Sequence, residues 1–305
     1  MKARPKEHRG RLAPRLAWQL AAPHTWPAAV MPVLLACCAA QATFGRPSPL
    51  MALVLLAIAV LMQSAVNALN DYFDYVKGSD SAEDAVEASD AVLVYNDVSP
   101  KAALWLAVGF LAVALGLGCY VISQAGWVPL AIGLVGGAAV ALYSGGRNPL
   151  SYLPVGELVS GLVMGGLIAL ASYQALTGRF EPLVLAWSVP SVIGIGLIMM
   201  TNNACDIEKD VPAGRRTLPV LLGRPRTRRL YQGLLVAWPL AIAVDVALWF
   251  PSGVALLPLL ALAAYPLLKA LGKNPLVPAT RIGAMGQVCA ANVALGALYG
   301  CAMLF

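Results

Sequence analysis

The sequence predicts an all-α, polytopic membrane protein with about nine transmembrane helices. Three observations support this fold class: 59% of the 305 residues are hydrophobic, only 12% are charged, and long apolar stretches recur along the chain. An ordinary soluble domain carries about twice that share of charged residues. Because so few polar groups cannot cover a soluble protein of this size, we expect lipid to surround much of its surface.

A helix needs about 20 mostly apolar residues to cross the hydrocarbon core of a bilayer. A basic tail at residues 1–17 precedes the first such stretch, and proline at Pro251 separates the seventh from the eighth, because proline bends or ends a helix. In chain order, the candidate spans are 18–40, 49–73, 102–123, 127–144, 155–176, 182–204, 230–250, 252–272 and 283–304.

Basic residues are concentrated in alternate connections between these spans. With a cytoplasmic N-terminus, all of the 21 Lys and Arg residues except Arg46 and Arg179 fall on the cytoplasmic side. The positive-inside rule therefore predicts a multi-pass protein of the cell (inner) membrane whose C-terminus lies outside. The net charge of +6 then reflects topology and attraction to anionic lipid headgroups, and it does not indicate a nucleic acid partner.

A first polar group closes the second span, in the segment Asn67-Ala-Leu-Asn70-Asp71-Tyr-Phe-Asp74. Its asparagines and aspartates recur at intervals of three or four residues, so on an α-helix they share one face. Lys77 and Asp80 follow shortly after. Ionisable groups are costly within a membrane, so such a face predicts a functional site.

A second polar group closes the sixth span, in the segment Asn202-Asn203-Ala-Cys-Asp206-Ile-Glu208-Lys-Asp210. Asn202, Asp206 and Asp210 repeat at intervals of four and share a helix face, which Asn203 joins. Glu208 points away from that face, and we expect it to be solvated.

The two polar groups end their spans on the same side of the membrane. This suggests one transmembrane domain over residues 18–305, with a pseudo-repeat of four-helix units at 18–144 and 155–272 and a ninth helix at 283–304.

Four carboxylates that converge on one cavity would repel one another unless a cation lies between them. Oxygen ligands in such numbers suit Mg²⁺, which commonly bridges protein carboxylates to substrate phosphates. Asparagine amides can add neutral oxygens, and basic side chains near the two groups can bind diphosphate oxygens: Lys77, Arg147, Arg215 and Arg216. This set predicts a metal–diphosphate site, at which an aromatic ring captures the allylic cation left by a departing diphosphate.

The two acidic segments resemble the paired aspartate-rich motifs of the UbiA superfamily of intramembrane prenyltransferases. Members of that superfamily have nine helices around a central cavity and two Mg²⁺ ions that hold the prenyl diphosphate. Further segments resemble the branch that uses 1,4-dihydroxy-2-naphthoate as the acceptor: residues 23–27, 70–80, 143–150, 156–157 and 202–218. The likeness extends from about residue 15 to about residue 225.

The resemblance implies a role for each matching residue. The principal metal-site acids would be Asp71, Asp74, Asp206 and Asp210, with Asp80 as a further ligand and Asn67, Asn70 and Asn203 assisting. Lys77, Arg147 and Arg216 would contact the diphosphate, and Tyr143 would line the acceptor side. The implied reaction replaces the naphthoate carboxylate with a polyprenyl chain, releases CO₂ and diphosphate, and gives demethylmenaquinol for menaquinone biosynthesis.

The segment from residue 81 to residue 97 departs from the family pattern. It is rich in acids, and Val92-Leu93-Val94-Tyr95 stands where the family usually has glycines. We expect a divergent, solvated cap; the alternative is a loop adapted to another acceptor, or a weakened lid over the site.

Three other functions are compatible with the same residues. The first is prenyl transfer to another acceptor, such as 4-hydroxybenzoate, homogentisate, a glycerol lipid or haem. The second is secondary transport coupled to cations, although transporters often have inverted repeats and midplane sites, whereas both acidic groups here are expected at one level. The third is an inactive scaffold, which the presence of all four principal acids disfavours.

Overall fold

The computed structural model describes residues 12–77, 92–96, 98–144 and 149–305, and this part of the chain is helical without strands. It forms two compact units. Unit 1 comprises Met1–Trp26 and Val54–Tyr120, and unit 2 comprises Pro27–Leu53 and Val121–Phe305. The first acidic motif lies in unit 1 and the second lies in unit 2.

Most of unit 1 comes from four helices and a short 3-10 turn. Their bounds are α1 Pro14–Ala21, η1 Pro23–Thr25, α3 Pro49–Lys77, α4 Val92–Tyr95 and α5 Pro100–Ala125. The first residues of α3 and the last residues of α5 belong to unit 2. The core of unit 1 contains Leu20, Ala68, Val92, Leu93 and Val98, all of which are buried.

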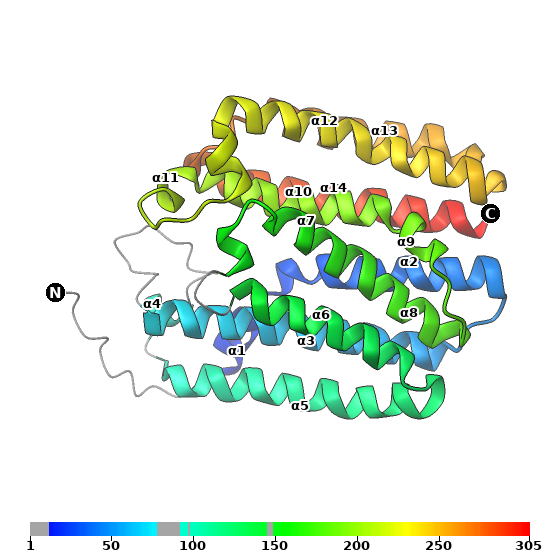
Figure 1. The fold of residues 1–305 in the computed structure, drawn as a ribbon, viewed down its shortest axis with the longest axis horizontal. Helices are drawn as coiled ribbons and strands as arrows, with labels where there is room; N and C mark the ends of the chain where they lie inside the picture. Colours follow the sequence, from blue (N-terminus) through cyan, green and yellow to red (C-terminus); the bar gives the residue numbers. More distant parts are fainter. Residues whose placement is uncertain (1–11, 78–91, 97, 145–148) are drawn as a thin grey trace. The chain divides into compact units, whose positions relative to one another are not determined.

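Unit 2 contains the remaining described helices. Their bounds are α2 Pro27–Phe44, α6 Val128–Ser144, η3 Leu150–Tyr152, α7 Gly156–Ser160, η4 Gly161–Leu167, α8 Ile168–Thr177, α9 Leu183–Trp187, α10 Val189–Cys205, α11 Ile207–Asp210, α12 Leu218–Trp249, η5 Pro251–Leu256, α13 Leu257–Lys273, η6 Pro278–Thr280 and α14 Arg281–Leu304. Figure 1 shows α12 and α13 side by side, and α10 packs against both α12 and α14.

Seven helical segments in the described part of the chain are long and apolar enough to cross a membrane. They are Pro27–Phe44, Pro49–Phe73, Pro100–Ala125, Gly156–Thr177, Leu218–Trp249, Pro251–Lys273 and Pro278–Leu304. Two shorter apolar helical segments, Val128–Ala139 and Val189–Cys205, occupy the fourth and sixth predicted positions. The predicted fold class, an all-α polytopic membrane protein, is confirmed.

Two predicted span boundaries are wrong. The first long helix begins at Pro27 instead of residue 18, because α1 ends at Ala21 and the chain turns through η1. Pro23 and Pro27 each begin a helical segment, as proline does where a missing N–H costs nothing. The seventh lies within Leu218–Trp249, which is kinked at Gly223 (φ 71°, ψ 157°), so the helix begins after that kink instead of at residue 230 and its first turns carry basic residues.

The helix that follows Gly156 packs unusually close to α10. A Cβ atom on Gly161 would lie 2.5 Å from the backbone oxygen of Val192, and one on Gly165 would lie 2.7 Å from its nitrogen. Only glycine therefore fits at these two positions. Residues Gly161–Leu167 form a π-helix, a feature that often occurs beside functional sites.

Candidate functional site

The second acidic motif lies where α10 ends and α11 begins. Asp206 joins the two helices, with φ −100° and ψ 12°, and its backbone N–H donates to the carbonyl of Asn202 at 3.1 Å. One turn later, Asp210 ends α11 and is only 1% exposed. Asn202 thus lies in α10, Asp206 at the junction and Asp210 in α11, so the three residues do not belong to one uninterrupted helix as their spacing predicted.

An arginine from the last helix contacts this motif. Arg281, the first residue of α14, donates from Nη2 to Oδ1 of Asn202 at 2.7 Å. Its Nε also lies 3.5 Å from Oδ1 of Asp206. Both charged side chains are about three-quarters buried, so Arg281 neutralises Asp206 in a partly desolvated setting.

Asp210 has an arginine of its own. Arg215 Nη1 lies 3.1 Å from Asp210 Oδ1, and Thr217 Oγ1 donates to Asp210 Oδ2 at 3.5 Å. Burial raises the pKa of Asp210, while the positive charge of Arg215 acts in the opposite direction. The Arg215 guanidinium also lies over the Tyr152 ring, 5.2 Å from its centre. These contacts fix Arg215 beside the carboxylate.

The segment that follows the motif is also held in place, through a backbone contact with Tyr152. The Arg216 backbone N–H donates to the carbonyl of Tyr152 at 2.8 Å, while the Arg216 side chain is exposed.

Glu208, in the second motif, is exposed, and Arg224 Nη2 donates to its Oε1 at 2.6 Å. That hydrogen bond lowers the pKa of Glu208. Glu208 thus points away from the motif face, as its spacing predicted.

Asn203, in α10, makes a hydrogen bond to a side chain of α7. Its Nδ2 donates to Oε1 of Glu157 at 2.8 Å, and both side chains are buried. Glu157 Oε2 is buried and has no hydrogen-bond partner in the described part of the chain. Tyr143 lies beside this pair, because a Cβ atom on Gly156 would be 3.5 Å from the Tyr143 hydroxyl.

The first acidic motif lies near the end of α3, in unit 1. Asn67 Nδ2 donates to Thr25 Oγ1 at 2.8 Å and to the carbonyl of Ala21 at 3.0 Å, so its amide holds the turn between α1 and η1. Asp71 is 7% exposed and accepts backbone hydrogen bonds from α4. Asn70 is exposed. Asp80, Arg147 and the side chains of Asp74 and Lys77 lie outside the described residues.

Of the divergent segment, residues 81–91 and 97 lie outside the described residues, and the described part, residues 92–96, differs from the solvated cap that the sequence predicted. Val92 and Leu93 are fully buried and belong to the core of unit 1. The physical reason is that Val92–Tyr95 forms one helical turn whose apolar side packs inward, while the acids that suggested solvation come before it. The expectation of a solvated cap is therefore wrong for this turn.

The sequence did not predict that three further residues contact the second motif. Arg281 is 71 residues away from Asp210, Glu157 lies in a helix between two other spans, and Thr217 follows two arginines. Glu157 is the one acid near the middle of the chain, between residues 98 and 180, and that isolation is the signal that could have singled it out.

The side chains at the second motif fit a hard divalent cation. The groups available near its face are carboxylate and amide oxygens. Among the described residues, no group of three or more His, Cys, Asp or Glu side chains is placed to hold a metal ion. Mg²⁺ does not require such a cage, because it commonly takes one or two carboxylates and completes its shell with water and substrate phosphates.

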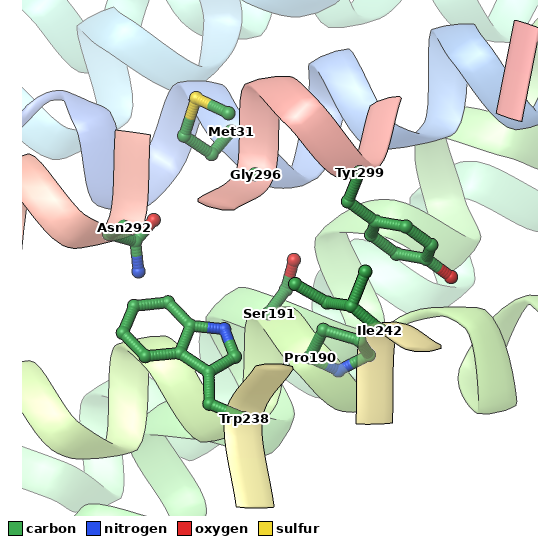
Figure 2. Close-up of a pocket in the computed structure, with 8 residues that line it drawn as sticks. All are labelled: Met31, Pro190, Ser191, Trp238, Ile242, Asn292, Gly296 and Tyr299. Carbon is green, nitrogen blue, oxygen red and sulfur yellow. The ribbon is translucent and has the colours of Figure 1, made fainter. Parts of the chain in front are cut away.

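A small pocket elsewhere in unit 2 does not have the chemistry of a diphosphate site. Figure 2 shows Asn292 and Trp238 close to each other on one side of it and Tyr299 on the other. None of its lining residues is charged, so it offers no ion pair to a phosphate or a metal. They are Met31, Pro190, Ser191, Trp238, Ile242, Asn292, Gly296 and Tyr299.

Comparison with known proteins identifies relatives over most of the chain. The UbiA prenyltransferase family matches residues 29–276. A 1,4-dihydroxy-2-naphthoate octaprenyltransferase from Bacillus subtilis (strain 168) is 36% identical over 209 residues, which are 68% of this chain and 66% of the relative. A protein with the same name from Mycobacterium tuberculosis (strain ATCC 25618 / H37Rv) is 33% identical over 282 residues, which are 91% of this chain and 94% of the relative.

Solved structures show a similar fold. A UbiA homolog from Archaeoglobus fulgidus bound to GPP and Mg²⁺ has a TM-score of 0.62 and 17% sequence identity, over 95% of this chain and 99% of that chain. The same homolog bound to DMAPP and Mg²⁺ has the same TM-score over 94% of this chain and 98% of that chain. At this identity the likeness shows the shared fold alone.

Proposed function

Because the chain belongs to the UbiA prenyltransferase family, we propose that it transfers a polyprenyl chain from its diphosphate to 1,4-dihydroxy-2-naphthoate. The observation that carries this choice of acceptor is the Mycobacterium tuberculosis relative, whose name states that acceptor and which matches nearly the full length of both chains. The reaction depends on Mg²⁺, releases CO₂ and diphosphate, and gives demethylmenaquinol for menaquinone biosynthesis.

In the proposed reaction, one bond breaks in each substrate and one carbon–carbon bond forms between them. The bond between the first prenyl carbon and the diphosphate oxygen breaks, and the oxygen keeps the electron pair. The allylic carbon bonds to the ring carbon that carries the carboxylate, and loss of CO₂ returns the electron pair of the broken carbon–carbon bond to the ring. When bound, Mg²⁺ supplies Lewis-acid stabilisation of the charge that develops on the diphosphate.

The two acidic motifs have the role of binding the metal ions, of which we propose two. The carboxylates concerned are Asp71, Asp74, Asp80, Asp206 and Asp210, assisted by the amides of Asn67, Asn70, Asn202 and Asn203. What supports this assignment in the described residues is the oxygen-rich segment from Asn202 to Asp210, in which Asn203 and Asp210 are buried. Tyr143, next to Gly156, is proposed to line the acceptor side.

The arginines at the second motif are proposed to bind the diphosphate. Arg215 and Arg281 lie against Asp210 and Asp206, within one side-chain length of the oxygens that would bind a cation. Each guanidinium has N–H donors that could turn from the carboxylate to phosphate oxygens, which accept such donors in pairs. Lys77, Arg147 and Arg216 are proposed to add further contacts.

The membrane location follows from the substrate. The isoprenoid tail remains in hydrocarbon, while its charged head reaches a site at the membrane surface. We place that site and the N-terminus on the cytoplasmic side of the cell (inner) membrane, because the basic connections lie there under the positive-inside rule.

The proposal is tested with purified protein in nanodiscs. A polyprenyl diphosphate is offered with 1,4-dihydroxy-2-naphthoate, 4-hydroxybenzoate or homogentisate in separate reactions, and products are identified by mass spectrometry. The proposal predicts prenylation of the naphthoate only, and none when EDTA replaces Mg²⁺. Product from another aromatic acid alone would support prenyl transfer but contradict 1,4-dihydroxy-2-naphthoate as the acceptor.

A further inference from the structure

Glu157 lies outside both acidic motifs, yet it makes a buried contact with one of them. Its Oε1 accepts the hydrogen bond from Asn203 Nδ2 at 2.8 Å. Glu157 is 5% exposed and Asn203 is 3% exposed, so water does not compete for this bond. A hydrogen bond that links a carboxylate to an amide in such surroundings is among the stronger ones in proteins.

The surrounding backbone keeps Glu157 in this position. A Cβ atom on Gly196, in α10, would lie 3.5 Å from the backbone oxygen of Glu157. Four and eight residues further along, Gly161 and Gly165 bring the same helix against the backbone of Val192. The helix that carries Glu157 therefore packs closely along α10, the helix that carries Asn203.

This contact determines which way the amide of Asn203 points. A carboxylate accepts hydrogen bonds, so the amide nitrogen must face Glu157 and the amide oxygen must face elsewhere. Among the described residues, Asn203 Oδ1 has no hydrogen-bond partner. The oxygen is thus available to a ligand, three residues before Asp206.

We propose that Glu157 is a positioning residue that orients Asn203 so that its Oδ1 serves the metal–diphosphate site; this inference rests on the proposed function. Partners of this kind are bound to a ligand of the metal and not to the metal itself. Their removal typically weakens metal binding or activity by about 10- to 100-fold.

The test measures Mn²⁺ as a probe for the Mg²⁺ site. Protein in nanodiscs with a polyprenyl diphosphate is titrated with Mn²⁺, and the free ion is followed by electron paramagnetic resonance. Glu157→Ala is expected to weaken Mn²⁺ binding by about 10- to 100-fold. Glu157→Gln keeps an oxygen that can accept from Asn203, so its affinity should stay within about threefold of the unmodified protein.

Two further variants separate positioning from folding. Glu157→Asp keeps the charge but shortens the side chain, so it should weaken Mn²⁺ binding like Glu157→Ala even if the alanine variant does not fold. Combining Glu157→Ala with Asn203→Ala should be no worse than Asn203→Ala alone, because both changes remove one interaction. Glu208→Ala, at an exposed acid of the same segment, is the matched control and should bind Mn²⁺ normally.

Three results would overturn the positioning role. They are normal Mn²⁺ affinity in both Glu157→Ala and Glu157→Asp, equal losses in Glu157→Gln and Glu157→Ala, or additive losses in the double variant. If the unmodified protein binds no Mn²⁺ in the presence of the diphosphate, the proposed function itself fails, and the role of Glu157 fails with it.

Discussion

The Asp71 carboxylate accepts a hydrogen bond from the backbone N–H of Val92 at 2.7 Å, across 20 intervening residues. Its other oxygen accepts from the N–H of Leu93 at 3.2 Å. The first N–H groups of a helix have no partners within the helix, so Asp71 satisfies two of them at the start of α4. A motif carboxylate is thereby tied to the divergent segment in unit 1.

This connection predicts that the buried part of the divergent segment stabilises unit 1. Leu93→Ala removes a fully buried side chain and should destabilise the protein by about 2–5 kcal/mol. Tyr95→Ala, two residues later at a 42% exposed position, should cost clearly less. Thermal unfolding in detergent measures both. Equal melting temperatures for Leu93→Ala and the unmodified protein would show that the segment does not contribute to the core.

Loss of a motif carboxylate should abolish turnover without loss of folded protein. Asp206→Asn keeps the size of the side chain but removes the charge that we propose binds Mg²⁺, and Asp74→Asn does the same in the first motif. Each should lower turnover by more than the roughly 10- to 100-fold typical of residues that support a metal ligand. Prenyl transfer is measured at saturating substrate, with size-exclusion profiles to verify folding. Near-normal turnover in either variant would contradict a two-motif metal site.

Removal of Arg281 should have opposite effects on the metal-free and metal-bound protein. Arg281→Ala removes the ion pair with Asp206 and the hydrogen bond to Asn202, which should destabilise the metal-free protein by about 1–3 kcal/mol. The same change removes a cation that competes with Mg²⁺ for Asp206. Added Mg²⁺ should therefore raise the melting temperature more in the variant than in the unmodified protein. An unchanged or smaller rise would show that Arg281 does not compete with the metal.

The close approach of two helices in unit 2 gives a prediction about packing. Gly165→Ala places a Cβ atom 2.7 Å from the backbone nitrogen of Val192, so the helices must separate. Overpacking of this kind costs about 1–3 kcal/mol. Gly133→Ala is the control, because its Cβ would have no atom within 4 Å. Similar melting temperatures for the two variants would be inconsistent with the observed packing.

Some features of the fold could be predicted because they depend on local composition. Apolar stretches give the spans, since a bilayer core requires continuous hydrophobic length. The intervals of four predicted one helix face for Asn202, Asp206 and Asp210, but they could not show that the helix is interrupted at Asp206, between α10 and α11. Helix ends were less predictable: the part of α12 that follows the kink at Gly223 begins with several basic residues, and hydropathy detects only its apolar part.

The partners of the motif residues could not be predicted, because they come from distant parts of the chain. Nothing within a few residues of Asp206 indicates that Arg281 contacts it, and nothing near Asn203 points to Glu157. Such contacts depend on how helices pack, which sequence spacing alone does not determine. The burial of Leu93 was missed for a related reason, since neighbouring acids concealed a short apolar turn.

The central claim, prenyl transfer that replaces the naphthoate carboxylate, is tested most directly by following that carboxylate. Purified protein in nanodiscs is given a polyprenyl diphosphate, Mg²⁺ and 1,4-dihydroxy-2-naphthoate labelled with ¹⁴C in the carboxyl group, and released CO₂ and diphosphate are counted together. The account predicts that the two are released in equal amounts, and that neither is released without Mg²⁺. Diphosphate release without labelled CO₂ would contradict it.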